Sequence, residues 1–266
     1  MSKPAIFLVI PTFFYLQTNF MLTPTNSVSL QDYSIYNSSL SDLDLSKKTL
    51  ITTINQYSYC IAEQDAEFKN ALLESDVLLP DGMAIVSAVQ LKTGKKIKKI
   101  AGADIHLHLL HDLNKKAGSC FYLGSSECTL SKIKERLAIE FPNIQVATYS
   151  PPFKSHFSKF ENKEMIDVIN DFAPDVVFVG MTAPKQEKWA FHHKTQLKTK
   201  TICAIGAVFD FYAGTVERPS LFWVNLKLEW LIRLVKEPKR MWKRYLYYGP
   251  VFIGYMLQNK KRLVLK

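Results

Sequence analysis

Along most of the chain, short runs of consecutive apolar residues alternate with longer stretches in which apolar residues recur every three or four positions. The short runs lack polar–apolar alternation, which is typical of strands buried on both faces of a parallel sheet. The longer stretches have the spacing of helices that cover such a sheet. The predicted strands are residues 48–55, 76–80, 120–124, 144–149, 176–180 and 201–206. The predicted helices are residues 62–74, 82–91, 104–116, 126–140, 161–172 and 184–194.

This alternation predicts a Rossmann-like α/β fold, with a mostly parallel sheet and helices on both faces. The pattern changes after Phe211, where helical stretches over residues 221–236 and 238–248 combine tryptophans with lysines and arginines. A chain of 266 residues is long enough for one large domain with an appendage. The expected parts are an apolar N-terminal extension (1–30), an α/β core (31–216) and a basic, aromatic helical appendage (217–266).

The N-terminal extension has more than one interpretation. Residues 5–22 carry no charge and are mostly apolar, as in a signal-like or membrane-associated segment. Pro11 and several polar residues interrupt it, and no clear cleavage pattern follows. The segment could insert in a membrane, pack on the core, or be absent from the mature protein.

The positive charge is concentrated at one end of the chain. The formal net charge is +10, and residues 227–266 hold eleven Lys or Arg against two Glu. A nearly neutral body with a basic tail indicates an anionic partner, such as nucleic acid, a phospholipid surface or a diphosphate.

The cysteines and histidines do not indicate a metal site. Cys60, Cys120 and Cys203 lie in apolar surroundings, form no C-x-x-C pair, and are expected to be core residues in a reduced, cytoplasmic setting. The three histidines between positions 106 and 111 are not spaced to share one helix face, and no H-E-x-x-H motif occurs.

A strand-to-helix junction near residue 184 is a candidate ligand site. The apolar run 176–180 leads through small residues to Pro184, which suits a first helical position. Lys185 and Gln186 would then lie in the first helical turn, at the sheet edge where ligands bind. A helix N-terminus beside a lysine suits a phosphate. The alternative is an ordinary connection between a strand and a helix.

Polar residues also follow other predicted strands. Asp81 stands after the strand 76–80, where a carboxylate can take a proton from a hydroxyl nucleophile; alternatively, it caps the next helix. Thr53 and Asn55 would point to the same side and could bind a sugar, or they could form a turn.

Two further strand ends add candidates of the same kind. Gly124 and Ser125 offer backbone N–H groups to a phosphate or ribose, although the segment lacks both G-x-G-x-x-G and the P-loop lysine. Asp210 offers a carboxylate near the loop after the last strand.

Six blocks of sequence together resemble the WecG/TagA/CpsF glycosyltransferases, in order from about residue 44 to residue 248. The resemblance does not cover the first 30 or so residues. The blocks are Leu79-Pro-Asp-Gly82, Ala101-Gly-Ala-Asp104, Tyr122-Leu-Gly-Ser125, Phe178-Val-Gly-Met-Thr-Ala-Pro-Lys-Gln-Glu187, Phe209-Asp-Phe-Tyr-Ala-Gly214 and Leu228-Glu-Trp-Leu-Ile-Arg-Leu-Val-Lys-Glu-Pro-Lys-Arg240.

The resemblance implies an activity and a set of site residues. The activity is inverting transfer of an N-acetylmannosamine-type sugar, or its uronic acid, from a UDP donor to a polyprenyl-diphosphate-linked sugar in bacterial surface or cell-wall polymer synthesis. It implies Asp81 as the base, with Thr53 and Asn55 nearby. The donor site would comprise Gly102, Asp104, Gly124, Ser125, Gly180, Lys185, Gln186, Glu187 and Asp210. The arginines expected to bind diphosphate without a metal or cofactor are Arg218, Arg233, Arg240 and Arg244.

The expected location is the cytoplasmic face of the plasma membrane, where the basic appendage would meet an anionic surface. A homo-oligomer is compatible with this composition. The rival hypotheses are a non-catalytic nucleic-acid binder that uses the same tail and a nucleotide-sugar enzyme with a soluble substrate. The chain departs from the family pattern at one place that bears on the donor sugar. Family members often carry Gly-Gly where this chain has Gly206-Ala207-Val208, and the added side chains at 207–208 are expected to narrow that loop.

Overall fold

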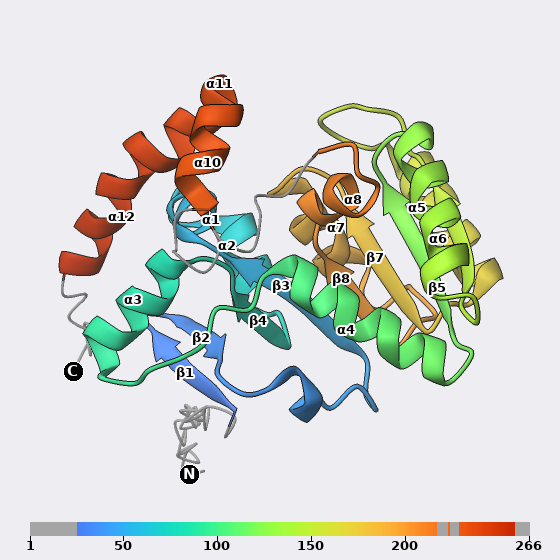
Figure 1. The fold of residues 1–266 in the computed structure, drawn as a ribbon, viewed down its shortest axis with the longest axis horizontal. Coiled ribbons are helices and arrows are strands. Elements are labelled where there is room, and N and C mark those ends of the chain that lie inside the picture. The colour runs from blue at the N-terminus through green and yellow to red at the C-terminus, as the bar shows by residue number, and fades with distance from the viewer. Residues whose placement is uncertain (1–25, 217–222, 224–228, 259–266) are drawn as a thin grey trace, which may run out of the picture.

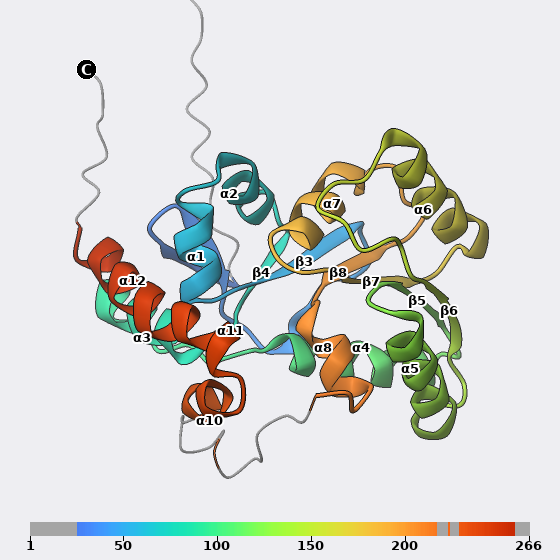
Figure 2. The same ribbon diagram turned by 90° about the horizontal axis from the view of Figure 1, so that it is seen from above.

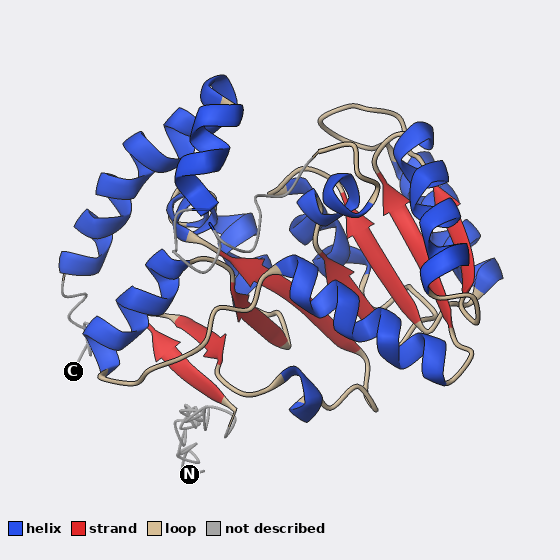
Figure 3. Cartoon of the chain, in the orientation of Figure 1, coloured by secondary structure: helices blue, strands red, loops and turns tan. Residues whose placement is uncertain are grey.

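The computed structural model of the protein describes residues 26–216, Trp223 and residues 229–258. Its centre is a six-stranded sheet with the order β4-β3-β8-β7-β5-β6, in which every neighbouring pair is parallel (Figures 1 and 3). The predicted parallel α/β fold is therefore confirmed. The strands are β3 (Thr49–Ile54), β4 (Val77–Pro80), β5 (Ser119–Gly124), β6 (Gln145–Tyr149), β7 (Val176–Gly180) and β8 (Thr201–Ala204).

Helices cover both faces of the sheet (Figure 2). One face carries α4 (Gly102–Lys115), α5 (Glu127–Glu140) and α8 (Ala207–Tyr212), and the other carries α6 (Lys159–Phe172) and α7 (Lys185–His193). Successive side chains of a strand point to opposite faces, so neighbouring residues enter different cores. Thus Phe178 lies in the α4 and α5 core, whereas Val177 and Val179 lie in the α6 and α7 core.

A third core lies beside the β4 edge of the sheet. It is formed by the antiparallel hairpin of β1 (Ser27–Leu30) and β2 (Tyr33–Tyr36) and by helices from both ends of the chain. Those helices are α1 (Gln56–Ala62), α2 (Ala66–Leu73), α3 (Met83–Thr93) and α12 (Tyr248–Leu257). The chain described before residue 31 is therefore tied to the core through β1.

The C-terminal helices are docked on this third core. After α10 (Glu229–Lys236), α11 (Pro238–Trp242) and the π-helical turn η2 (Lys243–Tyr247), α12 packs against α1. Their contact is aromatic: the rings of Tyr59 and Phe252 lie edge to face, with centroids 5.3 Å apart. Among the described residues, no helix is long and apolar enough to cross a bilayer.

Several boundaries differ from the predicted ones. The helix expected at 62–74 corresponds to α2 and begins later, because the Asp65 side chain accepts a hydrogen bond from the Phe68 N–H and caps the helix at that point. The helix predicted from residue 104 begins at Gly102, so Asp104 is the third residue of α4, and its carboxylate accepts a hydrogen bond from the Ala101 N–H at 2.8 Å. Pro184 precedes α7 as its N-cap rather than opening it.

Several elements were not predicted, among them the hairpin, α1, α8 and the helical run that continues through α12. The hairpin strands and α8 are too short to show a period. The α12 sequence contains Gly249, Pro250 and Gly254, which favour a helix poorly. Its buried residues Phe252 and Met256 pack in the third core, and this tertiary contact outweighs the low propensity.

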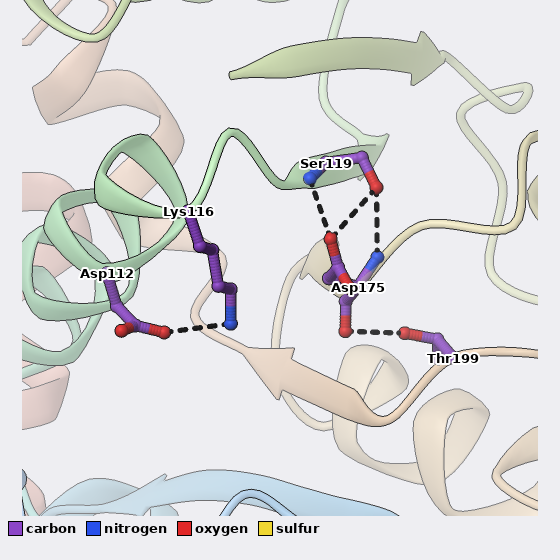
Figure 4. A network of polar contacts seen from close by, with 5 residues as sticks. All are labelled: Asp112, Lys116, Ser119, Asp175 and Thr199. Carbon is purple, nitrogen blue, oxygen red and sulfur yellow. Dashed lines mark hydrogen bonds and ion pairs between the residues drawn. The ribbon is translucent and has the colours of Figure 1, made fainter. Parts of the chain in front are cut away.

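Polar side chains join the amino ends of three strands (Figure 4). The Asp175 carboxylate accepts from the Ser119 N–H at 2.8 Å, and the Asp175 N–H donates to the Ser119 hydroxyl oxygen at 3.1 Å. The Thr199 hydroxyl donates to the Asp175 carbonyl at 3.0 Å, and Lys116 pairs with Asp112 on the adjacent helix. These bonds tie β5, β7 and β8 together at the edge opposite the strands' carboxyl ends.

At the carboxyl edge, β5 and β7 approach so closely that only glycine fits. Gly124 has φ +115°, and a Cβ there would lie 2.4 Å from the Gly180 carbonyl oxygen. A Cβ on Gly180 would lie 2.3 Å from the Phe209 ring. The end of β7 is therefore bare backbone covered by α8.

We expect Gly124→Ala to lower the free energy of unfolding by about 2–4 kcal/mol, because it adds a backbone clash to an unfavourable φ. The matched control is Gly94→Ala, also at a positive φ (+72°) but with no atom within 4 Å of the added Cβ. It should cost about 1 kcal/mol. Denaturant unfolding measures both, and equal losses would show that the close approach adds nothing.

Candidate functional site

The carboxyl ends of the strands open into a cleft of about 1230 Å³. Parallel strands gather these ends at one edge, where open α/β sheets bind ligands. Most of the residues predicted from the sequence line this cleft, although they come from separate segments of the chain. They are Thr53, Asn55, Asp81, Gly102, Gly124, Ser125, Gly180, Lys185, Gln186, Glu187, Asp210 and Arg244.

Asp81 lies where β4 gives way to α3. Its N–H donates to the Ile54 carbonyl at 2.9 Å, which holds the ends of β3 and β4 together. The N-cap position of α3 is occupied by Gly82 and not by Asp81. Asp81 stands half-buried on the cleft wall.

Asn55 and Thr53 line the same wall, as the strand alternation predicts. Asn55 also has a structural role, because its Oδ1 accepts from the N–H groups of Tyr57 and Ser58, both at 3.0 Å. The side chain thus caps α1, and its Nδ2 amide is the group that could donate to a ligand.

Gln186 and Glu187 form a buried polar pair at the start of α7. Gln186 Oε1 accepts from the Gly206 N–H at 3.0 Å, and Gln186 Nε2 donates to Glu187 Oε1 at 2.8 Å. A Cβ on Gly206 would lie only 2.2 Å from Gln186 Oε1, so this contact requires glycine. The pair ties the N-terminus of α7 to the loop after β8.

Glu187 is the most unusual titratable group in the cleft. Its side chain is only 2% exposed, and its Oε2 has no hydrogen-bond partner among the described residues. Burial raises the pKa of this carboxyl to about 7, although the hydrogen bond from Gln186 opposes the shift. The carboxyl is thus protonated over part of the neutral range and could donate to a ligand.

The raised pKa of Glu187 has a consequence for stability. Between the unfolded value of 4.5 and about 7, the folded state binds more protons, so stability falls as pH rises through this window. Glu187→Gln removes the titration. We expect the difference in unfolding free energy between wild type and variant to change by about 3 kcal/mol between pH 4 and pH 8, with the wild type losing stability.

Denaturant unfolding at several pH values measures this difference. The control is Glu164→Gln, which alters an exposed carboxyl of the same cleft. Parallel pH profiles for wild type and Glu187→Gln would show that Glu187 does not titrate in this window.

Lys185 is held at the cleft rim by neighbouring groups. Its ammonium donates to the Lys154 carbonyl at 2.8 Å and lies 4.6 Å from the centroid of the Phe157 ring. Partial burial lowers its pKa. The lysine therefore tethers the loop after β6 to α7 while adding positive charge to the rim.

Four helices begin at the cleft. The first residues of α4, α5, α7 and α8 line it, and helix N-termini present N–H groups and a positive dipole end to a ligand. The Ser126 hydroxyl caps α5 by accepting from the Thr129 N–H. Acidic side chains, Glu127, Glu161 and Glu164, line the side nearest β6. Positive potential for an anion therefore comes mainly from helix ends, Lys185 and Arg244.

Of the four arginines predicted to bind diphosphate, the structure describes the side chain of Arg244. Arg244 lies 4.7 Å from the centroid of the Tyr57 ring and lines the cleft next to Asp81. Arg233 and Arg240 lie on α10 and α11, but their side chains are outside the described structure, as is Arg218 altogether. Asp104 does not line the cleft, because its carboxylate caps the backbone of α4.

The loop after β6 completes the cleft and was not predicted as part of it. Ser150, Pro151 and Phe153 line one side, and the Ser150 hydroxyl donates to the Ser125 carbonyl at 2.7 Å. The signal was present in the sequence, because Ser-Pro-Pro follows a strand just as Asp81 and Gly124 do. The residues at 207–208 also line the cleft, with Val208 packed against Gly102.

The histidines and cysteines have structural surroundings. His106 is buried, with its Nε2 2.7 Å from the Tyr122 hydroxyl, and burial lowers its pKa to about 3. Cys60, Cys120 and Cys203 are buried, as predicted. Within the parts of the chain that the structure describes, no three His, Cys, Asp or Glu side chains gather as a metal site would require.

The sequence is similar to known proteins over most of its length. The model of the Glycosyl transferase WecG/TagA/CpsF family matches residues 19–265. An N-acetylglucosaminyldiphosphoundecaprenol N-acetyl-beta-D-mannosaminyltransferase of Bacillus spizizenii is 30% identical over 220 residues, covering 82% of each chain. Proteins of the same description from Bacillus subtilis (30% identical, 74% of this chain and 75% of the relative) and Staphylococcus aureus (25%, 81% and 82%) are also similar.

Proposed function

Because the chain belongs to the WecG/TagA/CpsF family of glycosyl transferases, we propose that it moves an N-acetylhexosamine-type sugar from a UDP donor to a polyprenyl-diphosphate-linked sugar. We propose N-acetylmannosamine, which the relatives' names contain, or its uronic acid as the transferred sugar. The product would enter surface or cell-wall polymer synthesis. The observation that carries the proposal is one cleft that combines a candidate base, Asp81, with four helix N-termini.

Asp81 is proposed as the general base of an inverting transfer. It takes the proton of the acceptor hydroxyl while that oxygen bonds to the anomeric carbon of the donor. The bond between the anomeric carbon and the diphosphate oxygen breaks, and UDP leaves with the bonding electron pair. Thr53 and the Asn55 amide, on the same wall, would orient the hydroxyl or the transferred sugar by hydrogen bonds.

The departing diphosphate gains negative charge, which the site must stabilise. We assign this role to the helix N-termini of α5 and α7, to Lys185 and to Arg244, and we propose that no metal takes part. Gly102, Gly124, Ser125 and Gly180 line the cleft and would contact the donor through their backbone groups. Gln186, Glu187 and Asp210 would contact its polar groups. The cleft volume of about 1230 Å³ exceeds that of a typical small-molecule site and leaves room for both substrates.

The acceptor would bring the enzyme to a membrane surface. The C-terminal helices expose large apolar side chains, among them Val235, Trp242, Leu246 and Tyr247, within a basic segment. This combination is typical of helices that lie in a membrane interface. We therefore propose peripheral association with the anionic cytoplasmic face of the plasma membrane.

Asp81→Asn tests the base directly. Transfer from a panel of UDP-N-acetylhexosamines to a synthetic polyprenyl-diphosphate sugar should be measurable for the wild type. The variant should keep the fold but lose at least about 10²-fold in kcat, because the amide cannot accept the proton. Gln90→Ala, a change on the exposed face of α3 outside the lining of the cleft, is the control. Near-normal turnover of Asp81→Asn would rule out this role, and a wild type that uses no UDP-sugar would refute the donor.

Arg244→Ala tests the contribution of the C-terminal helices. Removing this cation from the cleft should lower kcat by about 10²-fold, the usual effect of losing one group that stabilises transition-state charge. Lys243→Ala removes a neighbouring exposed cation that does not line the cleft, and it should keep nearly full turnover. Steady-state kinetics measure kcat for both variants. Equal activity of the two would mean that Arg244 acts only as surface charge.

A further inference from the structure

A second cavity of about 640 Å³ lies between α3 and the C-terminal helices. It joins the cleft at one end, because Asn55, Tyr57, Asp81 and Arg244 line both cavities. The two spaces therefore meet at the proposed base. Figures 1 and 2 both show α12 alongside α3.

Away from Asp81, the lining of this groove becomes apolar. Ala84, Ala88 and Leu91 contribute from α3, and Phe252, Ile253 and Leu257 contribute from α12. The far end opens to solvent, where Leu91 is 74% exposed and Leu257 is 71% exposed. An open apolar channel that ends at a polar reaction centre suits a ligand with one polar end and one hydrocarbon end.

We propose that this groove binds the first isoprene units of the acceptor's polyprenyl chain, an inference that rests on the proposed function. The acceptor sugar then lies at Asp81, its diphosphate lies beside Arg244, and the chain runs along α3 towards Leu91. The groove would make the enzyme recognise the lipid itself, in addition to the sugar that it carries. Burial of hydrocarbon supplies the binding energy.

Positive charge at the outer end of the groove supports a polyprenyl chain that runs from Asp81 towards Leu91. Lys92, Lys95, Lys96 and Lys98 follow directly after Leu91 and are exposed. Such a run favours an anionic phospholipid surface. The eleven residues of α3 span roughly 16 Å, so the chain would leave the protein about that far from Asp81 and enter the bilayer beside the lysines.

A bulk phospholipid or a second copy of the protein would also cover apolar side chains. Neither of these occupants requires a groove that continues to Asp81, the proposed base. A lipid-linked acceptor does require it, because its hydrocarbon chain must connect the membrane to the sugar at Asp81. Continuity with the cleft therefore favours the acceptor chain.

Ser87→Trp tests the proposal by filling the groove. Ser87 is an exposed residue of α3 that lines it, so the substitution adds bulk without removing a core side chain. The matched control is Gln90→Trp, which adds the same bulk on the exposed surface of α3 outside the groove lining. Two acceptors are compared in detergent micelles: the same sugar diphosphate on a long polyprenyl chain, and on a methyl group too short to reach the groove.

For wild type and Gln90→Trp, we expect a lower KM for the polyprenyl acceptor than for the methyl acceptor. Ser87→Trp should raise the KM of the polyprenyl acceptor at least tenfold and leave kcat/KM for the methyl acceptor within about twofold. A Ser87→Trp enzyme that keeps the wild-type preference for the long chain would overturn the groove while the proposed function stands.

Two other outcomes are also decisive. Equal losses on both acceptors would place the effect at the headgroup and refute a chain-binding groove. If Ser87→Trp instead keeps the chain preference but no longer binds anionic vesicles that lack acceptor, the groove serves bulk membrane docking and the proposal is wrong. A wild type that transfers sugar to neither acceptor would refute the proposed function itself.

Discussion

The close approach of two backbones at the ends of β5 and β7 governs the form of the site. Neither Gly124 nor Gly180 has room for a Cβ, because the one would meet a carbonyl oxygen and the other the Phe209 ring. The floor of the cleft is therefore made of peptide groups. Since α8 rests on that floor through Phe209, the loop after β8 comes within reach of Gln186, and the cleft is closed on that side.

The second determinant is the docking of the C-terminal helices on α1. Aromatic contacts between Tyr59 and Phe252 hold α12 in place, and Arg244 reaches the Tyr57 ring beside the cleft. This packing adds a cation to the wall that carries Asp81 and forms a second cavity that meets the first at Asp81. A two-substrate reaction is consistent with two connected spaces, one polar and one apolar.

Much of the fold and the candidate site could be predicted from local patterns. Continuous apolar runs indicated buried strands, and the strand-end rule brought Thr53, Asp81, Gly124 and Lys185 to one edge. The rule works because all parallel strands end at the same edge. Asp104, which the family resemblance implied as a donor residue, does not line the cleft, because its carboxylate serves the backbone of its own helix. The same rule also places Ser150 in the cleft, because this residue follows β6 directly.

Periodicity and composition were sufficient for the fold class, the order of the central strands in the sequence and the basic, aromatic character of the C-terminal segment, because these properties depend on neighbours along the chain. Strand order, the burial of Glu187 without a partner for Oε2, and the groove between α3 and α12 depend on residues far apart in sequence. Helix α12 shows this most clearly: its glycines and proline argue against a helix, and only its packing on α1, nearly two hundred residues away, makes the helix favourable.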